Sequence, residues 1–193
     1  MEIIKEIGHI NCSIGSLANF FSYIKNYKEV FSNEVSSFEI LNENVFEIKI
    51  GSFPKISLTH SKSNKNSFSL KSNSNNFEFE ILINLSEISS KSSRCQIIFN
   101  ANFSMMIEMM AKKPLENFLT NIAKKIEKLE ARIDWKSKAE DIIAKINAFN
   151  PKPGAWFLLK NERVKILKAK EILQKGDPGI ILDNKLTVGC SVN

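Results

Sequence analysis

Residues Asp134–Gly189, DWKSKAEDIIAKINAFNPKPGAWFLLKNERVKILKAKEILQKGDPGIILDNKLTVG, carry the most informative pattern in this chain. Its first part repeats apolar residues at helical spacing from Trp135 to Phe149, and Asp134 is expected to cap that helix. The helix should end at Asn150, because a residue before proline disfavours helical backbone angles. Short strands bounded by turn residues are expected to follow, at about 155–160, 163–169, 179–183 and 185–190.

Helix and first strand meet at Pro151-Lys152-Pro153-Gly154-Ala155-Trp156. Prolines stiffen the exit from a helix and glycine permits unusual backbone angles, so alone this is typical of a generic helix-to-strand turn. Further residues at matching places give the segment a resemblance to the C-terminal domain of methionyl-tRNA formyltransferases: Trp135, Ile142–Ile146, Phe149, Arg163–Ile166, Ala169 and Pro178-Gly179. The resemblance covers about residues 123–193 and implies a truncated OB-like β-barrel.

The resemblance also implies a partner, initiator methionyl-tRNA, and hence a place in translation initiation. In that family the domain presents basic side chains to tRNA, and such contacts to phosphates position a nucleic acid without reading its sequence. A single lysine is more often a solvated surface charge, so the prediction concerns the group rather than any one member. The candidate tRNA contacts are Lys136, Lys138, Lys145, Lys152, Arg163, Lys165, Lys168 and Lys170.

Two features depart from the family's pattern. Its catalytic domain uses an Asn, a His and an Asp beside a Ser-Leu-Leu-Pro segment, whereas His60-Ser61 is not followed by Leu-Pro. We therefore expect no catalytic residue, no cofactor and no formyl transfer by this chain alone. The family's domain continues past the strand near 185–190, so we also expect an incomplete copy, joined near residue 123 by gene fusion or by a join in sequence assembly.

The preceding residues follow a different pattern. A strand is expected over 2–12, then helical spacing from Leu17 to Phe31, capped by Ser13 or Ser16. About six strands with alternating apolar residues follow between Val35 and Phe103, and one face should be covered. The cover is a long helix over about 106–129, in which Pro114 is expected to cause a kink or a break.

This order of elements is similar to the helix-grip fold of the START-like superfamily, also called SRPBCC or polyketide cyclase-like. We therefore predict an α+β protein with two domains, a START-like domain over 1–128 and a partial OB-like domain over 129–193. START-like proteins enclose a cavity that in many members binds an apolar ligand. The candidate cavity residues here are His60, Phe99, Met106 and Met110.

The cavity candidates have plainer interpretations. His60 shares the alternation of Ile56 and Leu58, but a lone histidine is more often a packing residue than a base. The methionines at 105, 106, 109 and 110 are flexible enough to line an adaptable cavity, but methionines on a helix more often simply fill a core.

Composition narrows the class of protein. The net charge is +6, and residues 129–193 hold 12 Lys and Arg against eight acidic residues, an excess that favours a polyanion or simply maintains solubility. Cys12, Cys95 and Cys190 lack metal-ligand or redox spacing, so we expect reduced thiols and no metal. With no signal peptide and no spanning apolar run, we expect a cytoplasmic protein without a membrane partner.

The sequence thus leaves three functions open. The first is tRNA-associated binding, implied by the resemblance of the last third. The second is binding of a small molecule or lipid by the START-like part, which predicts stabilisation by an apolar ligand and little dependence on salt. The third is a fusion or fragment with no evolved function.

Overall fold

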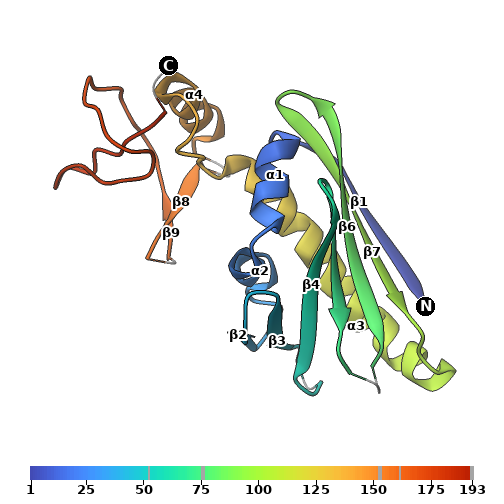
Figure 1. Cartoon of the computed structure of the whole chain (residues 1–193). Helices are drawn as coiled ribbons and strands as arrows, with labels where there is room; N and C mark the ends of the chain where they lie inside the picture. Colours follow the sequence, from blue (N-terminus) through green and yellow to red (C-terminus); the bar gives the residue numbers. More distant parts are fainter. Residues whose placement is uncertain (52, 75–76, 152–153, 161, 192–193) are drawn as a thin grey trace. The chain divides into compact units, whose positions relative to one another are not determined.

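The computed structural model describes residues 1–193 apart from 52, 75–76, 152–153, 161 and 192–193 (Figure 1). The chain divides into two compact units, Met1–Glu127 and Lys128–Asn193. The first unit combines a large antiparallel sheet with a long helix, as the sequence predicts, and the second is a smaller mixed unit.

The first unit follows one strand, two short helices, six strands and one long helix. In chain order these are β1 (Glu2–Ile10), α1 (Ile14–Phe21), α2 (Ile24–Phe31), β2 (Ser37–Ile40), β3 (Val45–Lys49), β4 (Ile56–Asn64), β5 (Ser67–Ser72), β6 (Phe79–Ser89), β7 (Ser92–Ala101) and α3 (Met105–Glu127). The sheet order is β1-β7-β6-β5-β4-β3-β2, so the first strand pairs with the last.

Strand alternation places the core on one face of this sheet. Along β6, the odd-numbered residues from Phe79 to Leu85 are buried while Glu80 and Asn84 are less so. The helices pack aromatic side chains against that face: Tyr27 of α2 stacks on Phe46 of β3 at 5.9 Å between ring centroids. Phe31 meets Phe118 of α3 at 5.6 Å, so the core lies between the sheet and the three helices.

The helix boundaries follow the local sequence. Ser13 is the N-cap of α1, and its side chain accepts a hydrogen bond from the backbone amide of Ser16. Of the predicted kink or break at Pro114, the break is wrong, because α3 runs continuously from Met105 to Glu127. Proline removes one donor and frees the carbonyl of Met110. Met110 and Pro114 are both exposed, so water can satisfy that carbonyl.

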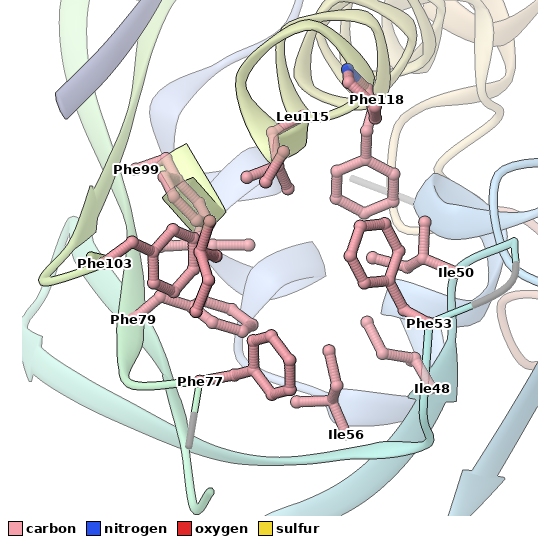
Figure 2. Close-up of a pocket in the computed structure, with 14 residues that line it drawn as sticks. Ile48, Ile50, Phe53, Ile56, Phe77, Phe79, Phe99, Phe103, Leu115 and Phe118 are labelled. Atoms are coloured by element: carbon pink, nitrogen blue, oxygen red, sulfur yellow. The ribbon is translucent and has the colours of Figure 1, made fainter. Parts of the chain in front are cut away.

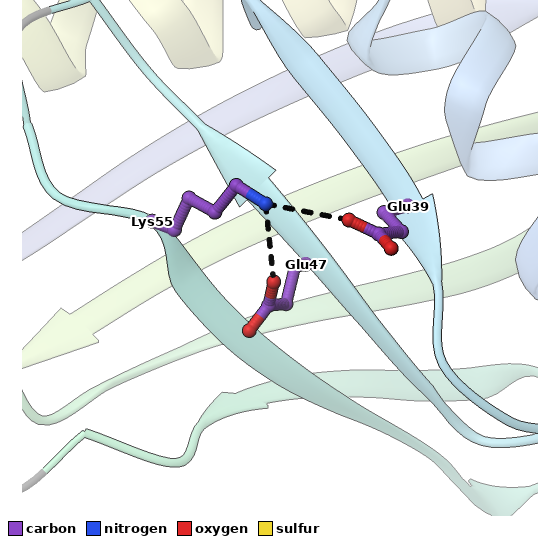
Figure 3. A network of polar contacts seen from close by, with 3 residues as sticks. All are labelled: Glu39, Glu47 and Lys55. Atoms are coloured by element: carbon purple, nitrogen blue, oxygen red, sulfur yellow. Dashed lines mark hydrogen bonds and ion pairs between the residues drawn. The ribbon is translucent and has the colours of Figure 1, made fainter.

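An ion-pair network fixes the segment before β4 to the edge of the sheet (Figure 3). Lys55 Nζ lies 3.3 Å from Glu39 Oε2 on β2 and 3.7 Å from Glu47 Oε2 on β3. Such exposed pairs each contribute at most about 1 kcal/mol. The ion pairs matter for position rather than stability, because they hold Lys55 at the end of the connection between β3 and β4, and this connection contains Phe53.

In the residues that are described, the second unit contains one short 3₁₀ helix, one α-helix and a two-stranded sheet. These are η1 (Lys128–Ala131), α4 (Ala139–Phe149), β8 (Trp156–Leu159) and β9 (Glu162–Lys165). Its core joins Ile133, Ile142, Ile146 and Ala155, with Trp135 packed edge-on against Phe157 at 5.4 Å.

The second helix begins later than its sequence predicts. Asp134 caps a turn instead of a helix: its Oδ1 accepts from the amide of Lys136, and α4 starts only at Ala139. The amide of Ser191 donates to the carbonyl oxygens of Trp135 and Ser137, and this pairing holds 135–138 out of the helix.

The later strands are shorter than predicted. Over 179–190 the described pairing is one antiparallel bridge, Ile181↔Val188, closed by Asp183, which accepts from the amides of Lys185 and Thr187. Of the predicted turn at Asn161-Glu162, Asn161 lies outside the described residues.

Candidate functional site

Sheet topology gathers three loops at one end of the first unit. Strands β3, β5 and β7 end there and β4 and β6 begin there, because each neighbouring pair is antiparallel. The described residues of the loops 50–55, 73–78 and 102–104 therefore meet beside the first turns of α3. Each carries a half-buried phenylalanine: Phe53, Phe77 and Phe103.

These loops close around an apolar cavity of about 40 Å³ (Figure 2). In Figure 2 the rings of Phe53 and Phe77 lie on its rim, while Leu115 and Phe118 point into it from α3. Its lining is wholly apolar: Ile48, Ile50, Phe53, Ile56, Phe77, Phe79, Ile81, Phe99, Phe103, Ile107, Ala111, Pro114, Leu115 and Phe118.

The chemistry of this lining selects against polar ligands. A hydroxyl or amide placed here loses its hydrogen bonds to water and finds no side-chain partner, at a cost of about 1–3 kcal/mol. A space of this kind needs about 10–15 Å³ to admit one water-sized group, so the cavity has room for roughly three such groups. It suits an aromatic ring or the end of a hydrocarbon chain.

The structure brings one of the four predicted cavity residues to this wall. Phe99 lines the cavity, whereas His60 is buried among other residues. Met106 and Met110 are 73% and 75% exposed, because α3 turns Ile107, Ala111 and Leu115 inward and the methionines outward. The role of these four residues in ligand binding stays a prediction.

His60 belongs to a buried polar contact at the end of α1. Its Nε2 lies 3.0 Å from the carbonyl oxygen of Phe21, and Tyr27 Oη donates to the same oxygen at 3.1 Å. Since a carbonyl only accepts, His60 carries its proton on Nε2. Burial lowers the pKa of His60, the bond to Phe21 opposes that shift, and the charge of Lys62 adds to it. Burial also raises the pKa of Tyr27, so both groups are neutral and hold α1 to the sheet.

The predicted tRNA contacts are spread over the second unit. Lys136 and Lys138 precede α4, and Lys168 and Lys170 follow β9; all four are exposed. Lys152 lies outside the described residues. The first turn of α4 also holds Glu140 and Asp141, which reduce the positive potential near Lys138.

Three of the predicted contacts bind the unit's own backbone or core. Lys145 Nζ donates to the carbonyl of Arg132 at 3.2 Å, and Lys165 Nζ donates to that of Pro151. The guanidinium of Arg163 lies 4.1 Å from the ring centroid of buried Trp156, a cation–π distance. These side chains therefore shape the surface on which the exposed lysines stand.

Gly154 makes the position of Lys165 possible. Its φ is +84°, a left-handed conformation that other residues resist, and a Cβ atom there would overlap the Lys165 side chain. The glycine of the helix-to-strand junction thus serves the turn and a close approach together.

Cysteine and metal chemistry add no site to the described chain. The three cysteines are free, and burial raises the pKa of Cys95 to about 12, so its reactive thiolate is scarce. Among the described residues no three His, Cys, Asp or Glu side chains gather as metal ligands. Within the same residues, none of the helices combines the length and hydropathy needed to cross a membrane.

In a comparison with solved structures, the fold of the first unit is similar to that of START-like proteins. A START superfamily protein from Mycobacterium smegmatis superposes with a TM-score of 0.53 at 13% identity, covering 66% of this chain and 98% of that one. Norcoclaurine synthase from Thalictrum flavum, solved with dopamine and hydroxybenzaldehyde, gives 0.55 at 13% identity, covering 67% and 85%. At these identities the likeness concerns the fold.

The remaining part of the chain has relatives by sequence. Residues 125–193 match the family model described as formyl transferase, C-terminal domain. Methionyl-tRNA formyltransferase of Pelagibacter ubique is 48% identical over 68 residues, 35% of this chain and 22% of that protein. The enzyme of Rhizorhabdus wittichii is 38% identical over 96 residues, 45% and 31%. The chain thus spans less than a third of the length of either relative.

Sequence reasoning missed the rim of the cavity. Phe53 lies between β3 and β4, whereas Phe77 and Phe103 continue the predicted alternation just beyond β6 and β7; none of the three was among the predicted cavity residues. Their signal was present in the order of strands: an aromatic residue lies in each of the three connections after β3, β5 and β7 that the antiparallel sheet brings to one edge.

Proposed function

We propose that residues 128–193 form an OB-like module that binds tRNA, as the C-terminal domain of methionyl-tRNA formyltransferase does, and that it acts on initiator methionyl-tRNA. The observation that carries the proposal is the match of residues 125–193 to that domain, with 48% identity to one such enzyme. The excess of 12 basic over eight acidic residues in 129–193 supports a polyanionic partner.

The exposed lysines and the basic residues that contact the module itself have different proposed roles. Lys136, Lys138, Lys168 and Lys170 contact phosphates, since their amines are exposed. Lys145 and Lys165 position backbone carbonyls, and Arg163 braces Trp156. Lys152 belongs to the proposed contacts by its place in the junction sequence.

A matched pair of variants tests this division. One changes the exposed lysines of the second unit to glutamine, and its control changes the same number of exposed lysines in the first unit: Lys136, Lys138, Lys168 and Lys170 against Lys28, Lys49, Lys65 and Lys71. Both remove four charges. Binding of labelled initiator tRNA is followed by fluorescence anisotropy at several salt concentrations.

Each lost phosphate contact reduces the slope of log affinity against log salt by about one. The second-unit variant should therefore lose up to about four units of slope, and the control should keep its slope. Equal losses in both variants would show that net charge, not the module, binds tRNA; no binding by the parent chain would reject the proposal outright.

A second function is favoured by the cavity of the first unit. Its aromatic lining and lack of polar side chains suit a small apolar ligand, and the START-like fold is compatible with such a role. A hydrophobic ligand would raise the unfolding temperature of the first unit independently of salt. If apolar compounds of roughly three to six carbon atoms do not raise the unfolding temperature of the first unit, the result argues against this function.

A further inference from the structure

Helix α3 is apolar on two opposite sides over its first turns. Ile107, Ala111 and Leu115 line the cavity. Met105, Met106, Met109 and Met110, which we call the methionine face, are 81%, 73%, 78% and 75% exposed, more than any other large apolar residue of the first unit. Neighbouring apolar side chains that are this exposed mark an interaction site, and the methionine face lacks a partner in the described chain.

The spacing makes this face continuous. Residues at i, i+1, i+4 and i+5 share one side of a helix, since each residue advances about 100°. Lys113 falls in the middle of that side and Lys112 at its border, and both are exposed. The nearby acids are half-buried: Glu108 lies toward the cavity side, and Glu116 lies on the same side as the methionines, one turn beyond them. The face therefore offers flexible apolar groups around positive charge.

We propose that the methionine face docks on an anionic lipid bilayer. Methionine side chains enter the boundary of acyl chains and headgroups, while Lys112 and Lys113 meet lipid phosphates. A second copy of this chain fits less well, because the face exposes Lys112 and Lys113, while its one acid, Glu116, is half-buried and lies beyond the methionines.

The apolar cavity is consistent with docking on a bilayer, because a bilayer holds apolar ligands. The first turns of α3 also form one wall of the cavity, and the cavity lining suits only apolar groups (Figure 2). A molecule with such a group dissolves in bilayers far better than in water. Docking through α3 brings the rim formed by Phe53, Phe77 and Phe103 to the end of the unit that meets the lipid. The docking itself rests on the exposed face and does not require an occupied cavity.

Flotation of the full chain with vesicles tests this docking. Vesicles of phosphatidylcholine with phosphatidylglycerol are compared with phosphatidylcholine alone, for the parent and for Met105→Gln/Met109→Gln. Both sites are exposed and glutamine favours helix as well as methionine does, so folding is preserved; thermal unfolding checks this. Leu173→Gln, at a fully exposed apolar site of the second unit, is the control.

The parent should float with the anionic vesicles. The double methionine variant should lose about 100-fold in partition coefficient, about tenfold per buried side chain, and the control should lose none. Lys112→Gln/Lys113→Gln should lose about 30-fold. Undiminished flotation of the methionine variant would overturn the proposal, since the basic second unit could attract lipid by charge alone. A dimer of the parent that the same variant dissociates would also overturn it, in favour of a second copy.

Discussion

Replacing Ala111 with leucine tests whether the space beneath α3 is a true cavity. Ala111 is 3% exposed and contributes to the lining. Leucine adds three carbon atoms, and the cavity of about 40 Å³ has room for roughly three water-sized groups. The new atoms can enter the space without displacing the rings of Phe99 and Phe118.

The expected effect is stabilisation. Burying three carbon atoms contributes about 0.8 kcal/mol each, and fixing the leucine side chain costs about 0.5–1 kcal/mol. Alanine and leucine differ little in helix propensity. The first unit should therefore gain about 1–2 kcal/mol in free energy of unfolding, and an apolar ligand should no longer stabilise it.

The matched control is Ala18→Leu. Ala18 is also a buried helical alanine, in α1, but it lies outside the cavity lining. Overpacking there should cost about 1–3 kcal/mol. Denaturant unfolding of the full chain is followed by far-ultraviolet circular dichroism, while tryptophan emission reports the second unit, which holds Trp135 and Trp156. If Ala111→Leu destabilises the first unit as much as the control does, the cavity argument is refuted.

Three further predictions follow from the contacts described above. Because burial holds the pKa of His60 below its ordinary value, the unfolded chain binds a proton that the folded chain does not, and the stability of the first unit should fall as the pH drops below about 6.5. A His9→Gln variant should show the same fall. A stability that stays constant from pH 7 to pH 5 would contradict the buried contact of His60. Cys95 should react with a maleimide only after unfolding, whereas half-buried Cys12 and Cys190 should react in the folded chain. Mass spectrometry of the labelled peptides shows which cysteines have reacted. Labelling of Cys95 in the folded chain would disprove its buried placement. Gly154→Ala and Gly179→Ala should each destabilise the second unit by about 1 kcal/mol, since both glycines have φ of +84°. Gly154→Ala should cost up to about 1 kcal/mol more, because the new methyl group displaces Lys165 from the carbonyl of Pro151. Equal losses of stability in tryptophan-detected unfolding would count against the close approach of Gly154 and Lys165.

The architecture of the first unit was largely predictable from local pattern. Alternation along residues such as Phe79 to Leu85 depends only on the two-residue period of a strand, and Ser13 caps α1 by local geometry. The cavity rim was harder, because Phe53 and Phe77 acquire their meaning only when distant strand ends meet.

The failures have a common physical origin. At Pro114 the helix continues because packing of Ala111 and Phe118 against the core outweighs one lost hydrogen bond. At Asp134 the helix is delayed because Ser191, from the far end of the unit, binds the carbonyl of Trp135. The outward turn of the methionines likewise depends on which side of α3 the sheet covers.

Deuterium exchange of the full chain, with and without initiator tRNA, measures most directly whether the second unit grips RNA. We predict slower amide exchange around residues 136–138 and 165–170, with the sheet of the first unit unchanged. Protection confined to residues 1–127, or no protection at saturating tRNA and low salt, would contradict the account.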